Sequence, residues 1–147
     1  MLRAGGGCQQ KATPRSWNLL VFSVGGRRLS VKTEEVSGIS RWKGSIPVPS
    51  RTPYILSVIR EHDSIWPVFD LAGLLRLSVQ GDRLLCLIAK HPRGAMAVCI
   101  DGEMPVLRTL DAADVHGYEE KDVPSFGSFS NGLEEVPIIS LSKLGSA

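Results

Sequence analysis

The sequence contains no long hydrophobic run. Its apolar stretches have the length of β-strands, far short of the roughly 20 apolar residues that a membrane-spanning helix requires. Near the N-terminus, Gly5-Gly6-Gly7-Cys8 looks like a lipobox, but no apolar segment precedes it, and no signal peptide is recognisable. We therefore expect a cytoplasmic protein that does not insert directly into a membrane.

The chain also lacks a strong excess of charge of either sign. Its formal net charge is +2 at pH 7, with 17 Lys and Arg residues against 15 Asp and Glu residues. Nucleic-acid-binding domains are usually far more basic. Trp42, between Arg41 and Lys43, is a cluster of the kind that binds single strands, but one such cluster is thin support for that function. No nucleic-acid partner is predicted.

Motifs for catalysis or cofactor binding are missing. The sequence has no phosphate-binding Gly-rich loop and no G-x-S-x-G, so the prediction is a protein that is not an enzyme and needs no cofactor. Its three cysteines form no C-x-x-C pair and are odd in number, which favours a reducing compartment over a disulfide framework. Cys86, His91 and Cys99 come from one predicted hairpin, so a redox or metal protein is a remote alternative. Both cysteines lie in apolar runs, which favours core positions without metal.

What the sequence does contain is a series of strand patterns. Residues 1–15 are rich in Gly, Gln and basic residues without periodicity and predict a flexible tail. Residues 19–31 form an apolar hairpin pattern around Gly25-Gly26. A second hairpin is predicted over residues 83–100, with its turn at His91-Pro92-Arg93-Gly94.

Short helical turns are predicted between these strands. Thr33 is a plausible cap for one turn, and Asp70 for a short helix over residues 71–75. Val36 and Ile39 have the spacing of one helical face, for which core packing is the default.

A repeated pattern links two distant parts of the chain. Residues 66–74 and 136–144 both read apolar-Pro-apolar-apolar-cap-Leu-x-x-Leu, and each half of the chain opens with a hairpin. This predicts one unit used twice, in which a hairpin precedes a proline-edged strand, and hence two similar small β-barrels. Residues 124–132, with three serines and two glycines, are predicted to be a surface loop before a last strand over 133–139.

Five segments in this order and spacing resemble the CheW-like chemotaxis coupling domain: residues 20–25, 35–39, 46–49, 53–59 and 65–71. Ile100-Asp101 and residues 136–139 also match, so the resemblance covers Trp17 to Leu144. It implies an all-β fold, in which residues 16–147 form a single domain of two packed five-stranded SH3-like barrels. It further implies a non-catalytic scaffold whose partners are a chemoreceptor signalling domain and the CheW-like regulatory domain of a histidine kinase.

The hairpin between residues 53–59 and 65–71 departs from the family pattern. In the family its tip reads N-L-R-G and contacts a partner; here these positions hold Arg60, Glu61, His62 and Asp63. By composition alone, this tip is either a solvated turn or a charged recognition surface. The resemblance leaves a second interpretation open: a divergent member that keeps kinase binding but has a different partner. Ser57 and Ala97 also replace glycines usual in the family, which regular strands would tolerate.

The residues predicted to contact a partner come from three segments. Trp42, flanked by basic residues, is a candidate for an exposed contact, whereas Trp66 is expected in the core. The resemblance implies that Val36 and Ile39 lie near a receptor-binding groove. The complete predicted set is Val36, Ile39, Trp42, Arg60, Glu61, His62, Asp63 and Ile65.

Overall fold

Two hairpins form the centre of the fold, as their apolar runs predict. The first joins β2 (Ser16–Val24) to β3 (Arg27–Lys32), and the second joins β8 (Leu85–His91) to β9 (Gly94–Ile100). Gly25 and Gly26 form the first turn with φ of 61° and 83°, in the left-handed region that glycine enters without steric cost.

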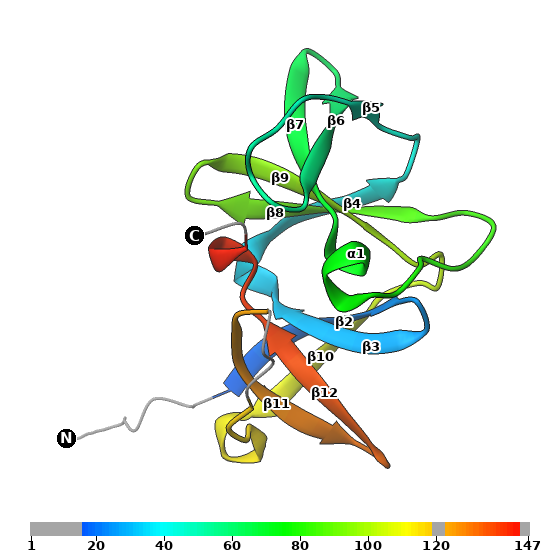
Figure 1. Cartoon of the computed structure of the whole chain (residues 1–147). Helices are drawn as coiled ribbons and strands as arrows, with labels where there is room; N and C mark the ends of the chain where they lie inside the picture. The colour runs from blue at the N-terminus through cyan, green and yellow to red at the C-terminus, as the bar shows by residue number, and fades with distance from the viewer. Residues whose placement is uncertain (1–15, 119–122, 145–147) are drawn as a thin grey trace.

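The structure is a computed structural model that describes residues 16–118 and 123–144. The tail predicted over residues 1–15 lies outside these ranges. Two curved sheets, one above the other, make up nearly all of the described chain, with α1 (Leu71–Leu75) between them (Figure 1). The predicted all-β class with two SH3-like barrels is confirmed, but one of the two sheets has six strands instead of the predicted five, because a short edge strand is added to it.

The first barrel is a five-stranded sheet in the order β10-β2-β3-β12-β11. Its outer strands are β10 (Val106–Asp111), β11 (Ser125–Asn131) and β12 (Glu134–Ile139). β12 runs parallel to β3, and the other pairs are antiparallel. An isolated antiparallel bridge between His116 and Ser128 joins the chain after β10 to β11.

The second barrel is a six-stranded sheet in the order β4-β8-β9-β7-β6-β5. It contains β4 (Val36–Arg41), the two-residue β5 (Ile46–Pro47), β6 (Ile55–Glu61) and β7 (Ser64–Phe69). β7 runs parallel to β9, just as β12 runs parallel to β3 in the first barrel.

Each central hairpin is buried on both faces, which explains why its strands read as continuous apolar runs. Leu20 and Phe22 of β2 face a core shared by the barrels, while Leu19 and Val21 face the interior of the first barrel. The interior of the second barrel contains Ile59, Val68, Cys86, Ile88 and Ala97. The fold therefore has one core between the barrels and one inside each barrel.

The predicted repeat is confirmed in local structure, since each half of the chain has a hairpin and a strand that contains proline. The prediction that each half forms its own barrel is wrong. The proline strand of the first half, β7, pairs with β9 of the second half, and β12 pairs with β3 of the first half. The chain builds one hairpin, completes the other barrel, and then returns to finish the first. Pairing between distant segments leaves no mark on the local pattern from which the repeat is recognised.

The helical turns agree only in part with prediction. Asp70 caps α1, because its side chain accepts a hydrogen bond from the Gly73 N–H at 3.0 Å, as predicted. Thr33 is not a cap: the 3-10 turn over Thr33–Glu35 begins after Lys32, without a side-chain capping bond. Two further 3-10 turns cover Ala112–Asp114 and Leu141–Lys143.

The loop predicted over residues 124–132 is wrong, because most of this segment is strand β11. Its small polar residues find partners inside the hairpin. Ser128 Oγ donates to Glu135 Oε1 at 2.5 Å and Ser130 Oγ donates to Glu135 Oε2 at 3.1 Å. These hydrogen bonds, first that from Ser128, lower the pKa of Glu135. Composition predicts a loop, but cross-strand pairing satisfies the serines and the buried Phe129 secures the strand.

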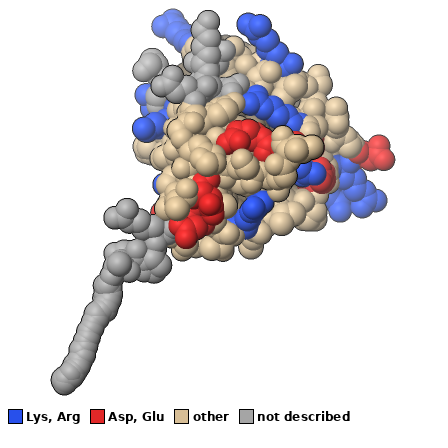
Figure 2. All heavy atoms as spheres, turned by 90° about the horizontal axis from the view of Figure 1, so that it is seen from below, with Lys and Arg blue, Asp and Glu red and all other residues tan. Residues whose placement is uncertain are grey.

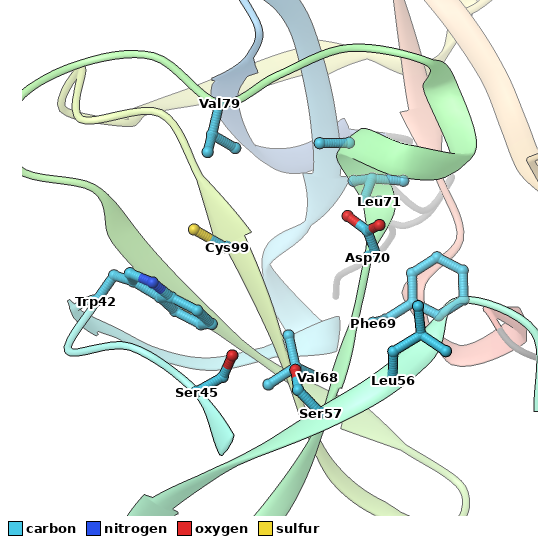
Figure 3. A pocket seen from close by; sticks show the side chains of 11 residues that line it. Trp42, Ser45, Leu56, Ser57, Val68, Phe69, Asp70, Leu71, Val79 and Cys99 are labelled. Atoms are coloured by element: carbon cyan, nitrogen blue, oxygen red, sulfur yellow. The ribbon is translucent and has the colours of Figure 1, made fainter. Parts of the chain in front are cut away.

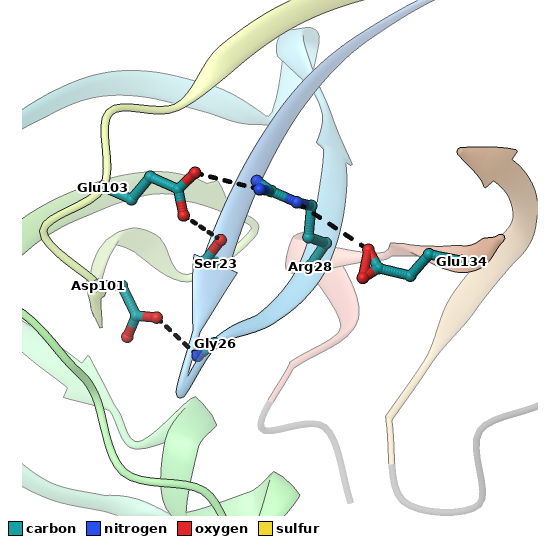
Figure 4. Close-up of polar contacts among 6 residues, drawn as sticks. All are labelled: Ser23, Gly26, Arg28, Asp101, Glu103 and Glu134. Carbon is teal, nitrogen blue, oxygen red and sulfur yellow. Dashed lines mark hydrogen bonds and ion pairs between the residues drawn. The ribbon is translucent and has the colours of Figure 1, made fainter. Parts of the chain in front are cut away.

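A buried carboxylate connects the barrels. Asp101, which follows β9 and is 4% exposed, accepts hydrogen bonds of 2.8 Å from the backbone N–H groups of Gly25, Gly26 and Gln80. Beside it, Glu103 accepts a hydrogen bond from Ser23 Oγ and forms an ion pair with Arg28 at 3.2 Å (Figure 4). These contacts hold the β2–β3 turn against the strand end of the other barrel.

Candidate functional site

The charged tip lies at the end of the β6–β7 hairpin, which projects from the second barrel (Figure 1). Its loop is His62-Asp63, between the paired residues Glu61 and Ser64. Arg60, His62 and Asp63 are exposed, and His62 Nε2 lies 3.9 Å from Glu61 Oε1. All four tip residues predicted for partner contact are therefore brought together.

Ile65 adds an apolar contact beside this charged tip. It pairs with Arg60 across the hairpin and is 65% exposed. An exposed isoleucine next to a flexible arginine offers a partner both apolar area and a charged donor. Five of the eight residues predicted for partner contact therefore lie together at the end of one hairpin.

His62 has a backbone conformation unusual for a residue with a side chain. Its φ is 52°, in the left-handed region that favours glycine. The positive φ therefore lies at the family arginine position, whereas Asp63, at the family glycine position, has none. The His62 side chain is held outward, 92% exposed.

Val36 and Ile39 lie on strand β4, so the prediction of a helical face is wrong. A register shift between Val36 and Gly38 lets Val36 pack against the shared core while Ile39 is 39% exposed. The β-bulge between these residues changes which face of the strand each side chain points to. The three-residue spacing of Val36 and Ile39 therefore fits a bulged strand as well as a helical turn, and the hydrophobic period alone does not distinguish the two. β4 is separated from β6 in the sheet order by β8, β9 and β7, so these residues and the hairpin tip belong to different strands of the barrel.

Trp42 is less exposed than its basic neighbours predict. It is half-buried and packs, like Trp66, against the interior of the second barrel. Its backbone N–H donates to the Leu84 carbonyl at 3.0 Å, which continues the β4–β8 pairing. Arg41 and Lys43 on either side are exposed.

The Trp42 side chain forms one wall of a groove at the mouth of the second barrel (Figure 3). The groove has a volume of about 210 Å³, and its lining is mainly apolar. Leu56, Val68, Phe69 and Leu71 contribute apolar walls, and Asp70 stands at its edge. Sequence reasoning missed this groove, because its lining comes from strand ends far apart in the chain. Leu56, which is 59% exposed, shows the groove only once the strands are packed, because its sequence neighbours are those of an ordinary strand.

The residues of the Cys/His alternative are not assembled into a site. Cys86 pairs directly with Cys99, but His91 pairs with Gly94 at the other end of the hairpin. Its Nε2 lies 2.8 Å from the Leu144 carbonyl oxygen. Within residues 16–118 and 123–144, no group of three or more His, Cys, Asp or Glu side chains is placed to hold a metal.

Both described thiols are chemically quiet. Burial raises the pKa of Cys86 to about 11, and burial together with the neighbouring Cys86 raises that of Cys99 to about 12. Both groups therefore stay protonated near neutral pH, whereas nucleophiles and metal ligands require the thiolate. Among the described residues, no helix is both long and apolar enough to cross a bilayer.

Comparison with known proteins agrees with this architecture. Residues 18–144 match the family described as CheW-like domain. The chain belongs to the CheW-like family. This CheW-like protein is thus a relative of scaffold and adaptor proteins of chemotaxis-type signal transduction, a family without catalytic activity whose members act through protein partners.

A solved structure shows the same fold. The scaffolding protein TtCheW from Thermoanaerobacter tengcongensis superposes with a TM-score of 0.76, covering 92% of this chain and 91% of that protein. Only 15% of the residues are identical, so the likeness concerns the fold. A search of curated protein sequences gives no match.

Proposed function

We propose that this CheW-like protein couples a chemoreceptor signalling domain to the CheW-like regulatory domain of a histidine kinase, as a cytoplasmic adaptor. The observation that carries the proposal is the retention of both barrels, with the β6–β7 hairpin projecting at the position where the family contacts a partner. A scaffold requires separate surfaces that two partners can occupy together. The hairpin tip and the groove beside Trp42 are two such surfaces.

A second function is favoured by the chemistry of the tip. Glu61 and Asp63 place carboxylates at the leucine and glycine positions of the family tip, beside the exposed polar side chains of Arg60 and His62. Such a tip would bind a partner by charge complementarity, which sets specificity and association rate more than affinity. The alternative is therefore an adaptor that keeps kinase binding and uses residues 60–63 and Ile65 for another sensor.

The test is isothermal titration calorimetry of the full chain against each of two partners from the same organism. These are the CheW-like regulatory domain of the kinase and a receptor signalling fragment. Micromolar binding to both is expected for the coupling function, and kinase binding alone would favour the second function. Binding to neither would overturn both.

A matched pair of variants assigns the surface. The quadruple variant Arg60→Asn, Glu61→Leu, His62→Arg and Asp63→Gly restores the family tip and is expected to strengthen receptor binding if a standard receptor is the partner. Arg93→Ala, in the exposed turn between β8 and β9, is the control. It is expected to change neither the affinity for the kinase domain nor that for the receptor fragment. If the two variants changed receptor binding equally, residues 60–63 would not belong to the receptor-binding surface.

A further inference from the structure

Strand β10 of the first barrel has an edge to which no strand is paired. It stands at one end of the order of the first sheet, and within residues 16–118 and 123–144 no strand pairs with its outer side. Such an edge presents a row of backbone N–H and C=O groups that another strand can bind. In β10 the free groups belong to alternate residues, and the pairing on the inner side determines which residues these are.

The turn of the β2–β3 hairpin determines which backbone groups of β2 face β10. Its two-residue loop makes Val24 and Arg27 a hydrogen-bonded pair, so every second residue of β2, counted back from Val24, bonds to β3. The residues between them bond on the other side, toward β10. Ser23 is the first of these, and its carbonyl accepts the Asp101 N–H at 2.9 Å, in the segment that leads into β10.

The same alternation continues into β10. The residues opposite the bonding positions of β2 are Val106, Arg108 and Leu110, so their N–H and C=O groups are used inside the sheet. The N–H and C=O groups of Leu107 and Thr109 point to the open edge. The pairing of β10 with β2 has no register shift, so this edge is straight and can take a further strand.

The other edges of the two sheets carry features that usually prevent strand pairing. β4 contains a bulge, β5 is only two residues long and includes Pro47, and β11 is bridged by His116. Bulges, short strands, proline and a covering segment are common ways in which proteins protect strand edges. Within its bounds β10 has none of these four features, which makes it the edge best suited to pair with another chain.

Apolar side chains are exposed where β10 begins. Met104, just before the strand, is 73% exposed, Val106 is 60% exposed and Leu107 is 72% exposed. Together they leave about 400 Å² of apolar surface, a patch size that often marks an interaction site on a soluble protein. A standard interface buries about 800 Å² on each partner. The patch and the adjoining strand backbone supply part of this area, so a weak contact is expected.

We propose that the β10 strands of two copies of this protein pair antiparallel across a two-fold axis at Leu107. The contact joins identical surfaces, so it closes with two copies and adds no third. The two five-stranded sheets then form one continuous sheet. The second barrel, with the charged tip and the Trp42 groove, takes no part in this contact, so the dimer does not depend on kinase or receptor binding.

The axis is placed at Leu107 because this register brings the apolar residues together. Leu107 lies opposite its own counterpart, and Val106 lies opposite Arg108 of the second copy. An axis at Arg108 would place two arginines directly opposite each other, which is unfavourable in a sheet. An axis at Thr109 would place Leu107 opposite Asp111, away from the apolar patch.

The charge of the first barrel gives this dimer a characteristic dependence on salt. Residues 16–35, 101–118 and 123–144 contain five Lys and Arg against eight Asp and Glu. Seen from the first-barrel end, both signs of charge occur on this face, with wide uncharged areas between them (Figure 2). Two copies that meet through their first barrels therefore repel each other weakly, and salt screens this repulsion. Dimerisation is expected to strengthen as salt is added.

Sedimentation velocity of the full chain over a range of concentrations tests the proposal. The wild-type protein is expected to convert from monomer to dimer, and to nothing larger, as its concentration rises. Leu107→Asp places two carboxylates at the axis and is expected to weaken dimerisation at least tenfold. Leu133→Asp, in the loop between β11 and β12, is the matched control and is expected to dimerise like the wild type. Both positions are exposed, so both variants should keep the fold, which circular dichroism checks.

Disulfide trapping tests the two-fold register directly. In a Cys8→Ser background, Leu107→Cys places two thiols opposite each other at a Cα separation of about 5.5 Å, within the range of a disulfide. Thr109→Cys lies on the same face of β10, but its counterpart is roughly 13 Å away along the strands. Under a mild oxidant, Leu107→Cys is expected to form covalent dimers at least tenfold faster than Thr109→Cys, as non-reducing gel electrophoresis measures.

Four results would overturn the proposal. The first is a wild-type protein that stays monomeric at millimolar concentration. The second is trapping that is equally fast at residues 107 and 109. The third is a Leu107→Asp variant that dimerises like the wild type, and the fourth is a Leu133→Asp control that loses dimerisation.

Discussion

The β6–β7 and β11–β12 hairpins occupy equivalent places in the two barrels and differ in two places, the register shift and the loop. Both have a proline in the second strand, a register shift near the start of the first, and a two-residue loop whose first residue has positive φ. At the shift, the first barrel has Gly127 and the second Ser57. In the loop, the first barrel has Gly132-Leu133 and the second has His62-Asp63.

The glycine at the shift is explained by how the first barrel is closed. Gly127 has a φ of 140°, and a Cβ there would lie 2.5 Å from the His116 carbonyl oxygen. The His116–Ser128 bridge brings this backbone close. Ser57 has no positive φ, so the second barrel accepts a side chain at the equivalent place even though a register shift makes the strand irregular there. In the first barrel, the strand at Gly127 packs directly against the His116 backbone, whereas the second barrel has an open groove lined by Ser57.

In the loops, too, the glycine belongs to the first barrel, but here both backbones have a positive φ. There the first barrel has the glycine that its backbone favours, whereas the second holds His62 in the same left-handed region. Retaining a side chain at a strained position of an exposed tip is typical of surfaces under functional constraint. Gly127 is thus required by the packing of the first barrel, whereas the backbone at His62 is not constrained by packing and its side chain is available to contact a partner.

The largest effect is expected where the barrels are tied together. Asp101→Ala removes the acceptor of three backbone N–H groups, two of them in the β2–β3 turn. We expect a loss of about 4 kcal/mol in the free energy of unfolding, because unpaired buried donors are costly. Urea denaturation measures it. Asp82→Ala, at an exposed position, is the control and should stay within about 0.5 kcal/mol; equal losses would contradict the role of Asp101.

The next largest effect on stability is expected at the register shift of the first barrel, and a much smaller one at that of the second. Gly127→Ala forces a Cβ against the His116 carbonyl in a backbone region that side chains avoid, and should cost about 3 kcal/mol. Ser57→Ala, at the equivalent place in the second barrel, should change stability by less than about 1 kcal/mol. Urea unfolding of both variants makes the comparison, and similar losses would mean that both bulges have the same requirement.

The smallest changes in stability are expected from substitutions of the first loop residue in each hairpin, His62 and Gly132. His62→Gly should raise the free energy of unfolding by about 0.5 kcal/mol, because relief of left-handed strain exceeds the added flexibility of the unfolded chain. Gly132→Ala should lower it by about 1 kcal/mol.

Asp63→Gly is the matched control for the loop. Asp63 does not have a positive φ, so this change should only destabilise. Thermal unfolding reports all three changes. If His62→Gly destabilised the protein as Asp63→Gly does, the backbone at His62 would not be strained.

Much of the fold was predictable from the sequence because the determining forces are local. The apolar runs of the central hairpins, the Gly25-Gly26 turn and the Asp70 cap all follow from strand burial, turn geometry and capping. The charged tip was also visible, since its four residues are consecutive. Failures came where two local patterns coincide: the bulge in β4 imitates a helical spacing, and the serine-rich β11 imitates a loop.

By itself, then, the sequence determined the all-β class, the two hairpins and the chemistry of residues 60–63. Only the tertiary structure decided which proline strand joins which hairpin, because parallel pairing of β7 with β9 and of β12 with β3 joins segments far apart in the chain. It also decided that Trp42 lines a groove and that Leu133 stands free. Exposure is a property of how the barrels pack, and no residue carries it alone.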